Sequence, residues 1–341
     1  LIYNQMHCPV LQRTKTGKVS TSGSTIRKLA NTKAEKKGNL TMDIVDKFGH
    51  VVLKADALNN SKYPALLVLD KYREYNKRKT AFYNRFNRTM KSGRIYFWVN
   101  QNGASSGRQS SPMHQLPPEL KDVIIADTDN HRFVDSDSSQ IELRMIAFLA
   151  GERELIDMCC DPENDIHRVI GSLISGVPMW KIDAATRKKG KCRNFGVVYC
   201  ISEYGLAGQM FGPGYTAENI AECKQLIADF FNRFKRINKY IKDNCDFVRK
   251  NGYIRTFFNR YRYFKEILDP DTTNKRKASL LRQANNTPVQ GTAADLLKIA
   301  ECNIQRYIDN KGWNKIVDGF PLVRMALSIH DETIVMAHRS I

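Results

Sequence analysis

The sequence lacks the cysteine spacing of a zinc-bound or disulfide-stabilised domain. Its eight cysteines form no Cys-x-x-Cys pair, and no histidine spacing completes a zinc site. The same scatter argues against a disulfide framework. We therefore expect reduced, partly buried thiols, as in an intracellular protein.

A long apolar run and a signal peptide are also missing. No stretch is long enough to span a bilayer, so we expect no membrane-spanning part. The 341 residues are 42% hydrophobic and 26% charged, which is typical of a globular chain with two or three subdomains. The chain begins at Leu1 rather than Met, which indicates a fragment or a processed product.

Acidic residues are in short supply. The chain has 35 Asp and Glu against 54 Lys and Arg, a net charge of +19. Such an excess most often serves to neutralise phosphate charge. An anionic membrane surface is the alternative, but basic and aromatic residues are interleaved, as in 72–79, and this favours nucleic acid.

One carboxylate, Asp137, is predicted at a point where a strand passes into a helix. A strand-like run at 132–134 precedes it, and an apolar helical pattern begins at Ile141. Side chains at such a junction reach out of a sheet into a cleft. Asp135 lies on the same strand face and competes for this position, and Asp137 could instead cap the helix.

A second acidic turn is predicted near the end of the sequence. His330, Asp331 and Glu332 lie between two apolar runs, 325–327 and 333–336, which is typical of a β-hairpin. Two acidic turns on neighbouring strands could hold two divalent ions roughly 3.5–4 Å apart, in contact with both oxygens of a phosphoryl displacement. We therefore expect a nucleotidyl-transfer enzyme in which two distant strand-bearing segments meet in one sheet.

A third pattern predicts a helix that binds a nucleotide. Its four residues recur every four positions and form a slanting stripe on one face: Arg187, Lys191, Phe195 and Tyr199. Two cations suit a triphosphate, and two aromatic rings suit a base. The alternative is a basic amphipathic helix whose aromatic rings pack in a core.

Together these blocks resemble family A DNA polymerases, the bacterial DNA polymerase I type. The run 139–144 after Asp137 is similar to motif A of that family, 187–199 to motif B, and 330–332 to motif C. Smaller blocks also match in chain order: 16–22, 107–111, 165–167 and 282–295. The resemblance covers nearly the whole chain.

The resemblance implies an α+β, right-hand polymerase fold with an antiparallel palm sheet and mainly helical thumb and fingers. The expected limits are 1–92 for a partial thumb, 93–150 for the first part of the palm, 151–280 for the fingers, and 281–341 for a C-terminally short second part of the palm. Periodicity adds a long helix over 63–90, a hairpin over 253–264, and separate helices at 278–282 and 292–307.

The resemblance also implies roles for individual residues. Asp137 and Asp331 would be catalytic and would bind two Mg²⁺ ions, for which Mn²⁺ can substitute, while Lys191 would donate a proton to pyrophosphate. The residues expected to bind the incoming dNTP are Arg187, Lys191, Phe195, Tyr199, His167, Glu142 and Gln140. Those expected to contact primer-template DNA are Arg108, Arg282, Asn286, Gln290 and His330. Glu142 would also exclude a ribose 2′-hydroxyl.

The implied activity is template-directed DNA synthesis, with nucleotidyl transfer from a dNTP to a primer 3′-hydroxyl by two-metal-ion catalysis. The alternatives are a non-catalytic or degenerate polymerase-fold protein that binds nucleic acid, and a single-subunit RNA polymerase, against which Glu142 argues. We expect a monomer whose partners are primer-template DNA, dNTPs and replication accessory proteins. We expect it in the cytoplasm of a bacterial or phage-infected cell, or in an organelle.

Three positions depart from the family pattern. Cys200 stands where a glycine usually follows the motif B tyrosine, so the pivot of that helix is expected to differ. Ser138 replaces a frequent tyrosine, and Ser328 replaces a glutamine that often precedes the His-Asp pair. The last change is expected to weaken a primer contact.

Overall fold

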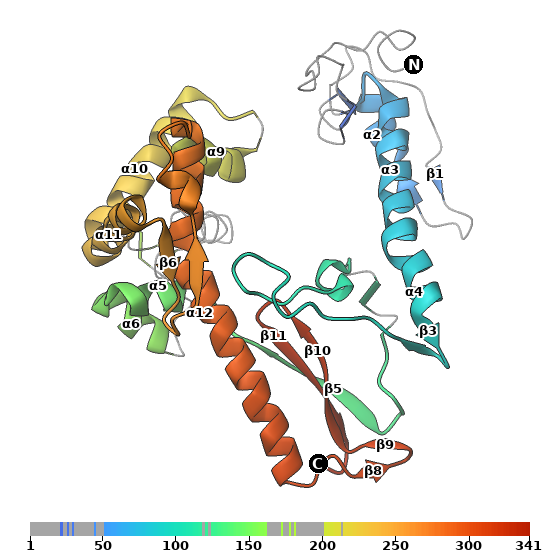
Figure 1. Cartoon of the computed structure of the whole chain (residues 1–341). Helices are drawn as coiled ribbons and strands as arrows, with labels where there is room; N and C mark the ends of the chain where they lie inside the picture. The colour runs from blue at the N-terminus through green and yellow to red at the C-terminus, as the bar shows by residue number, and fades with distance from the viewer. Residues whose placement is uncertain are drawn as a thin grey trace. The chain divides into compact units, whose positions relative to one another are not determined.

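The chain divides into two compact units, Leu1–Phe97 and Trp98–Ile341, and Figure 1 labels most of their elements. The computed structural model describes residues 21–22, 26, 29–30, 44–45, 51–117, 120–121, 124–161, 172, 177–178, 181, 201–212 and 214–341. None of the helices in these ranges combines the length and the apolar character needed to cross a bilayer.

The first unit is built around one long helical rod. Its first part, α3 (Pro64–Arg78), begins with a proline, which suits the first turn because the missing N–H has no helical partner there. The rod continues through a π-helical turn, η1 (Lys79–Tyr83), into α4 (Asn84–Thr89), so the predicted helix over 63–90 is confirmed. Leu66 packs in a small buried cluster with Ile26 and Leu29. Other elements described in this unit are α2 (Ala55–Asn60), the pair β1 (Ile44–Val45) and β2 (Val51–Leu53), and the pair β3 (Met90–Lys91) and β4 (Arg94–Ile95).

A three-stranded antiparallel sheet lies in the second unit, with the order β10–β11–β5. A tight turn joins β10 (Val323–Ile329) to β11 (Glu332–His338), as the predicted hairpin requires. Strand β5 (His131–Asp137), from much earlier in the chain, pairs with β11 so that Asp137 lies opposite Glu332. The expectation that the two acidic segments meet in one sheet is therefore confirmed.

A group of helices forms another part of the same unit (Figure 1). It contains α5 (Ile141–Ala150), α6 (Arg153–Cys160), α9 (Glu203–Phe211), α10 (Ala217–Arg233) and α11 (Lys235–Asn251). Its main core joins α5 and α6 to α10 and α11 through fully buried side chains that include Ile146, Leu155, Phe230 and Phe234. Each such side chain contributes roughly 1.5–3 kcal/mol on leaving water. This burial fixes α5, whose first turn follows Asp137.

The longest element is α12 (Asn274–Asn310), a single helix of 37 residues that contains Pro288. The prediction of two separate helices at 278–282 and 292–307 is wrong. Proline interrupts isolated helices because it lacks an N–H and clashes with the preceding turn. Here the residues around Pro288 are buried, and burial on neighbouring elements outweighs the local cost.

Short elements complete the unit: the hairpin β6 (Tyr253–Arg255) and β7 (Tyr261–Tyr263), which was predicted, the pair β8 (Ile316–Val317) and β9 (Phe320–Pro321), and the 3-10 turns η2 (Pro112–Gln115) and η5 (Lys265–Ile267). Every strand pair in the part of the chain that is described is antiparallel, and helices dominate, so the α+β class is confirmed. The limits of thumb, palm and fingers stay predictions.

Candidate functional site

Asp137 and Asp331 come together at one end of the three-stranded sheet. Asp137 is the last residue of β5, and Asp331 occupies the turn between β10 and β11. The backbone N–H of Ser138 donates to the carbonyl oxygen of Asp331 at 3.1 Å. This hydrogen bond ties the end of the strand to the turn and keeps the two predicted metal ligands adjacent.

Desolvation and negative charge both act on the carboxylates at this end of the sheet, although Asp137 is exposed. Desolvation raises the pKa of Asp137 above its ordinary value, and the charges of Asp331 and Asp135 raise it further. Desolvation also raises the pKa of Glu332. The hydrogen bond between Glu332 and Asp135, and the negative charge of Asp135, raise it further. Neighbouring carboxylates disfavour one another's ionised form, and a bound cation would remove that penalty.

The chemistry of these side chains suits a hard divalent cation, because Mg²⁺ prefers carboxylate and other oxygen ligands. Within the described ranges, no three His, Cys, Asp or Glu side chains gather as a metal site. An ion held by Asp137 and Asp331 would therefore complete its shell with backbone oxygens, water or a substrate phosphate, as Mg²⁺ commonly does. The residues present fit such an ion.

The first turn of α5 holds two further predicted residues. Gln140 precedes the helix in the left-handed conformation, with φ of 54°, and turns the chain sharply after Asp137. Glu142 is buried, and its carboxylate accepts a hydrogen bond from Nη2 of Arg108 at 2.6 Å. Burial raises the pKa of Glu142, while the charge of Arg108 and this hydrogen bond oppose the rise. Glu142, predicted to exclude a ribose 2′-hydroxyl, and Arg108, predicted to contact primer-template DNA, thus form one ion pair.

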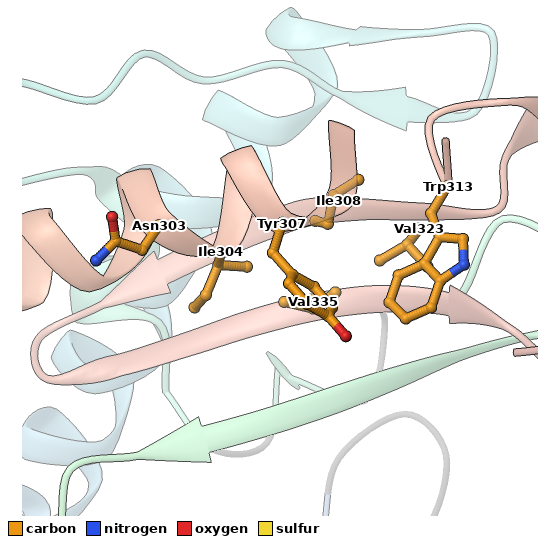
Figure 2. Close-up of a pocket in the computed structure, with 7 residues that line it drawn as sticks. All are labelled: Asn303, Ile304, Tyr307, Ile308, Trp313, Val323 and Val335. Atoms are coloured by element: carbon orange, nitrogen blue, oxygen red, sulfur yellow. The ribbon is translucent and has the colours of Figure 1, made fainter. Parts of the chain in front are cut away.

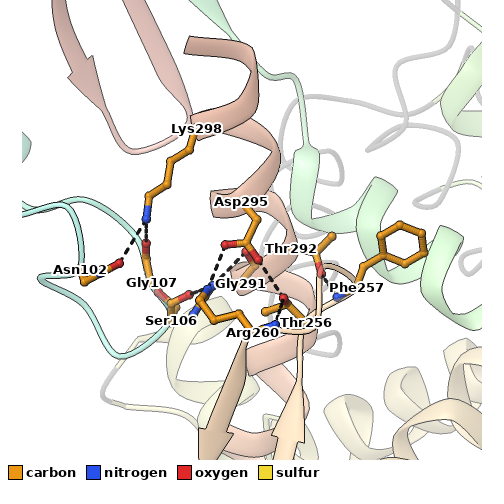
Figure 3. Close-up of polar contacts among 10 residues, drawn as sticks. All are labelled: Asn102, Ser106, Gly107, Thr256, Phe257, Arg260, Gly291, Thr292, Asp295 and Lys298. Atoms are coloured by element: carbon orange, nitrogen blue, oxygen red, sulfur yellow. Dashed lines mark hydrogen bonds and ion pairs between the residues drawn. The ribbon is translucent and has the colours of Figure 1, made fainter. Parts of the chain in front are cut away.

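Arg108 belongs to a loop that α12 holds in place (Figure 3). Nζ of Lys298 donates to the carbonyl oxygen of Gly107 at 2.8 Å. The side-chain amide of Gln109 donates to the carboxylate of Glu301 at 2.7 Å. The loop therefore has contacts to α12 on both sides of Arg108.

Arg260, which follows the turn of the β6–β7 hairpin, is the centre of this attachment (Figure 3). Its Nε donates to Asp295 at 2.9 Å, and its Nη2 donates to the carbonyl oxygens of Ser106 at 2.7 Å and Gly291 at 3.2 Å. Thr256 donates to the other carboxylate oxygen of Asp295 at 2.8 Å. One guanidinium thus joins the hairpin, the loop and α12.

Sequence reasoning assigned no role to this cluster. Asp295 is the last residue of the matched run 282–295, and its immediate neighbours in the helix are apolar: Ala293, Ala294, Leu296 and Leu297. An acidic residue in that setting requires a partner, because an unpaired buried charge is costly. That signal could have identified Asp295, although it could not have named Arg260.

Three predicted DNA contacts share one face of α12. Arg282, Asn286 and Gln290 recur every four residues, the spacing at which helical side chains neighbour one another. Arg282 is exposed, whereas the other two are half-buried. Oδ1 of Asn286 is buried and has no hydrogen-bond partner among the described residues.

His330 lies at the tip of the acidic hairpin in the left-handed conformation, with φ of 58°. Its exposed ring contacts the ring of His114 edge-on, with centroids 5.0 Å apart. The backbone N–H of Ser111 donates to Nδ1 of His114 at 3.0 Å. Burial lowers the pKa of His114, and the charge of His330 lowers it further.

The remaining predicted nucleotide-binding residues lie outside the described ranges. They are His167, Arg187, Lys191, Phe195 and Tyr199, and the departure at Cys200 lies there too. Their roles stay predictions.

A separate apolar groove lies between the C-terminal part of α12 and the sheet (Figure 2). Its volume is about 370 Å³. Its lining residues are Asn303, Ile304, Tyr307, Ile308, Trp313, Val323 and Val335. Because none of them is a predicted site residue, the groove is distinct from the carboxylate pair.

Comparison with known proteins identifies the class to which this fold and site belong. The sequence model that represents the family described as DNA polymerase family A matches residues 39–340 of this chain. The chain belongs to DNA polymerase family A.

Individual relatives agree with this assignment. DNA polymerase I of Chloroflexus aurantiacus is 34% identical over 286 residues, which is 81% of this chain and 28% of the relative. The thermostable DNA polymerase I of Thermus aquaticus is 30% identical over 286 residues, 81% of this chain and 32% of the relative. The chain therefore spans about a third or less of the length of these curated relatives.

A solved structure extends the agreement to the fold. It is the POL domain of Pol1 from M. smegmatis, in complex with DNA primer-template and dNTP. The TM-score is 0.74 at 26% identity, and the match covers 97% of this chain and 52% of that chain. The polymerase fold implied by the resemblance is thus confirmed.

Proposed function

We propose that this chain is a template-directed DNA polymerase that transfers a nucleotidyl group from a dNTP to the 3′-hydroxyl of a primer. The observation that carries the proposal is the meeting of Asp137 and Asp331 at one end of the sheet, tied by the Ser138 hydrogen bond of 3.1 Å. Membership of the family, and a structural relative described in complex with primer-template and dNTP, support the same activity.

The two carboxylates hold two Mg²⁺ ions in this proposal, and Mn²⁺ can replace them. When bound, such ions would favour deprotonation of the attacking hydroxyl at neutral pH and would neutralise charge on the transferred phosphate. Asp137 and Asp331 contribute negative charge that is fixed in position, because β-sheet pairing sets one side and a tight turn sets the other. Little reorganisation is then needed at the moment of reaction.

Glu142 and Arg108 define the sugar side of the proposed site. The buried carboxylate of Glu142 closes the space that a ribose 2′-hydroxyl would need, and Arg108 holds it there through the 2.6 Å contact. Arg108 also lies in the loop expected to face the primer, so primer binding and sugar selection share one ion pair. Gln140, in the sharp turn before α5, sets the distance between Asp137 and Glu142.

The face of α12 with Arg282, Asn286 and Gln290 is proposed to follow the minor groove of the primer-template, together with His330. Minor-groove acceptors are nearly the same for every base pair, so contacts there suit an enzyme that copies any sequence. Arg187, Lys191, Phe195, Tyr199 and His167 are proposed to bind the triphosphate and base, with Lys191 as proton donor to pyrophosphate.

Primer extension tests the proposal. A labelled primer on a longer DNA template, with dNTPs and Mg²⁺, should be extended by the wild type and not after chelation of the metal. Asp137→Ala and Asp331→Asn should each reduce extension by about 10³-fold or more, since each removes several kcal/mol of charge stabilisation. Their affinity for primer-template should stay close to that of the wild type.

Asp135→Asn is the matched control, because Asp135 lies on the same strand and next to Glu332. It should retain extension if Asp137 is the ligand. Full activity of Asp331→Asn would remove Asp331 from the site, and tight DNA binding without extension by the wild type would indicate a non-catalytic relative.

A further inference from the structure

The β6–β7 hairpin has a composition unlike the rest of the chain. Six of the twelve residues at 253–264 are aromatic and three are arginine, and the segment has no carboxylate. Aromatic residues make up only 10% of the whole chain. A short two-stranded hairpin needs some aromatic pairing for stability, but not exposed rings in this number.

The register of the hairpin separates two faces. Ile254 pairs with Arg262 and turns toward the protein, where Ile254 is buried in a small core. The other two pairs, Tyr253 with Tyr263 and Arg255 with Tyr261, turn to the opposite side, because successive side chains in a strand alternate. One face of the hairpin therefore consists of three tyrosines and an arginine.

Four rings form a continuous aromatic face: Phe247 of α11, Tyr253, Tyr261 and Tyr263. Tyr261 and Tyr263 are nearly parallel, with an interplanar angle of 20° and centroids 6.3 Å apart. Tyr253 contacts both of these rings, and Phe247 contacts Tyr253 at 5.3 Å. The exposed fractions are 64% for Tyr263, 48% for Tyr261 and 40% for Phe247. The rings thus contact one another and keep surface open to solvent.

One cation lies on this face, and two others flank its elements in the sequence. Arg255 is exposed on the same side of the hairpin, Lys265 follows β7, and Lys250 lies in the last turn of α11. Asp246, which precedes Phe247 in α11, is paired with Arg249 at 2.8 Å. Open rings that accept stacked bases, beside cations that neutralise phosphate, are the combination used by proteins that bind single-stranded nucleic acid.

The hairpin is also joined to the site. Its turn carries Phe257, whose ring contacts Phe148 of α5 with centroids 5.3 Å apart. It also positions Arg260, which binds the loop of Arg108 through the carbonyl oxygen of Ser106. The aromatic face therefore belongs to the same packed assembly as Glu142 and Arg108.

We infer that the aromatic face binds unpaired DNA, and that in a polymerase this is the single-stranded part of the template. The bases stack on Tyr261 and Tyr263, and Arg255 contacts the phosphate backbone. The placement on the template strand rests on the proposed polymerase function, whereas the binding of single-stranded DNA does not.

Equilibrium binding of two labelled DNAs tests this inference without dNTPs or metal. One is a blunt duplex, and the other has the same duplex with an unpaired 5′ template extension. The wild type should prefer the extended DNA. Tyr261→Ala and Tyr263→Ala should each weaken binding of the extended DNA by about 5- to 100-fold, the range seen when one stacking ring is removed, with blunt-duplex affinity unchanged.

Two variants control for loss of folding. Tyr263→Phe keeps the ring and should bind both DNAs as the wild type does. Tyr307→Ala removes a ring that is 54% exposed and packed on Trp313, far from the hairpin in sequence, and should change neither affinity. Thermal unfolding of all four variants shows whether the fold is intact.

Three outcomes would overturn the inference: equal binding of the two DNAs by the wild type, unchanged binding by both alanine variants, or an equal loss on both DNAs. Failure of the wild type to extend a primer would contradict the proposed function alone. In that case a preference for the extended DNA that disappears in Tyr263→Ala would still support the aromatic face.

Discussion

At the scale of single residues, Glu142 shows how burial and pairing compete at one carboxylate. Its side chain is 10% exposed and that of Arg108 is 24% exposed, so water screens the pair weakly. Removing one member of such a pair leaves an uncompensated charge and typically costs about 3–5 kcal/mol. Burial is nevertheless the larger influence on Glu142, because the pKa of the carboxyl is raised despite the arginine.

The raised pKa of Glu142 predicts a specific dependence of stability on pH. A carboxyl whose folded pKa lies above its unfolded value of 4.5 holds its proton more tightly in the folded protein. The tighter proton binding therefore stabilises the folded protein fully at pH values below the unfolded pKa. This stabilisation is lost as the pH rises through the folded pKa. The stability of the wild type should fall relative to Glu142→Gln over this interval.

Urea denaturation of the two proteins at a series of pH values from about 4 to 7 measures this difference. The common background of other titrating groups cancels in the comparison. A difference that stays constant across the interval would show that burial and Arg108 cancel at Glu142, and one that grows in favour of the wild type would show that Arg108 dominates.

At the scale of elements, the decisive feature is the junction of α12, the hairpin and the loop at Gly291. A Cβ on Gly291 would lie 2.5 Å from Cγ2 of Thr256, 2.9 Å from Nη2 of Arg260 and 3.3 Å from the carbonyl oxygen of Ser106. The three elements can approach this closely only because α12 has no side chain there. Glycine is a poor helix former, and the close contact between the three elements offsets its cost at this position.

Gly291→Ala should therefore destabilise the protein, although alanine normally favours a helix by about 1 kcal/mol over glycine. Overpacking at such a contact typically costs about 1–3 kcal/mol, and the Arg260 hydrogen bonds would be displaced as well. Primer extension should also decrease, because the loop of Arg108 depends on this junction. Chemical denaturation and the extension assay measure the two effects.

Gly208 in α9 is the matched control. A Cβ there would meet only Cε1 of Tyr215 at 3.6 Å, an ordinary contact. Gly208→Ala should raise the free energy of unfolding by up to about 1 kcal/mol. If both substitutions stabilise the protein, the close approach at Gly291 does not exist in solution.

Another element, α12, continues through Pro288 with support from the hairpin. Thr287 donates its hydroxyl to the carbonyl oxygen of Gln283 at 2.8 Å and accepts from Arg262 at 2.9 Å. Arg262 also donates to the side chain of Gln283 at 2.9 Å. These side-chain hydrogen bonds thus span the turn of α12 in which Pro288 has no backbone N–H to donate.

At the scale of the whole molecule, the net charge of +19 predicts strongly salt-dependent binding of DNA. Each phosphate contact releases condensed counterions, so affinity falls linearly with salt on a logarithmic scale. If about six phosphates are contacted, affinity should fall about 10³-fold between about 50 and 200 mM salt. Titration of labelled primer-template at several salt concentrations gives the slope, and a flat response would contradict phosphate binding.

The sequence by itself determined the local parts of the site. The turn with His330 and Asp331 follows from two apolar runs that flank polar residues, and the position of Asp137 follows from a change of period from strand to helix. These signals are local, because hydrophobic alternation and turn chemistry act over a few residues. The motifs also identified the family.

The sequence also predicted that the two acidic segments share one sheet, but only the tertiary structure decided the register of that pairing and the other contacts between distant segments. The pairing of β5 with β11, the ion pair of Arg108 with Glu142, and the junction at Gly291 join segments far apart in the sequence. The continuity of α12 through Pro288 likewise depends on burial against other elements. The physical reason is that burial and charge pairing act through space, and a pattern along the chain does not contain the partner's position.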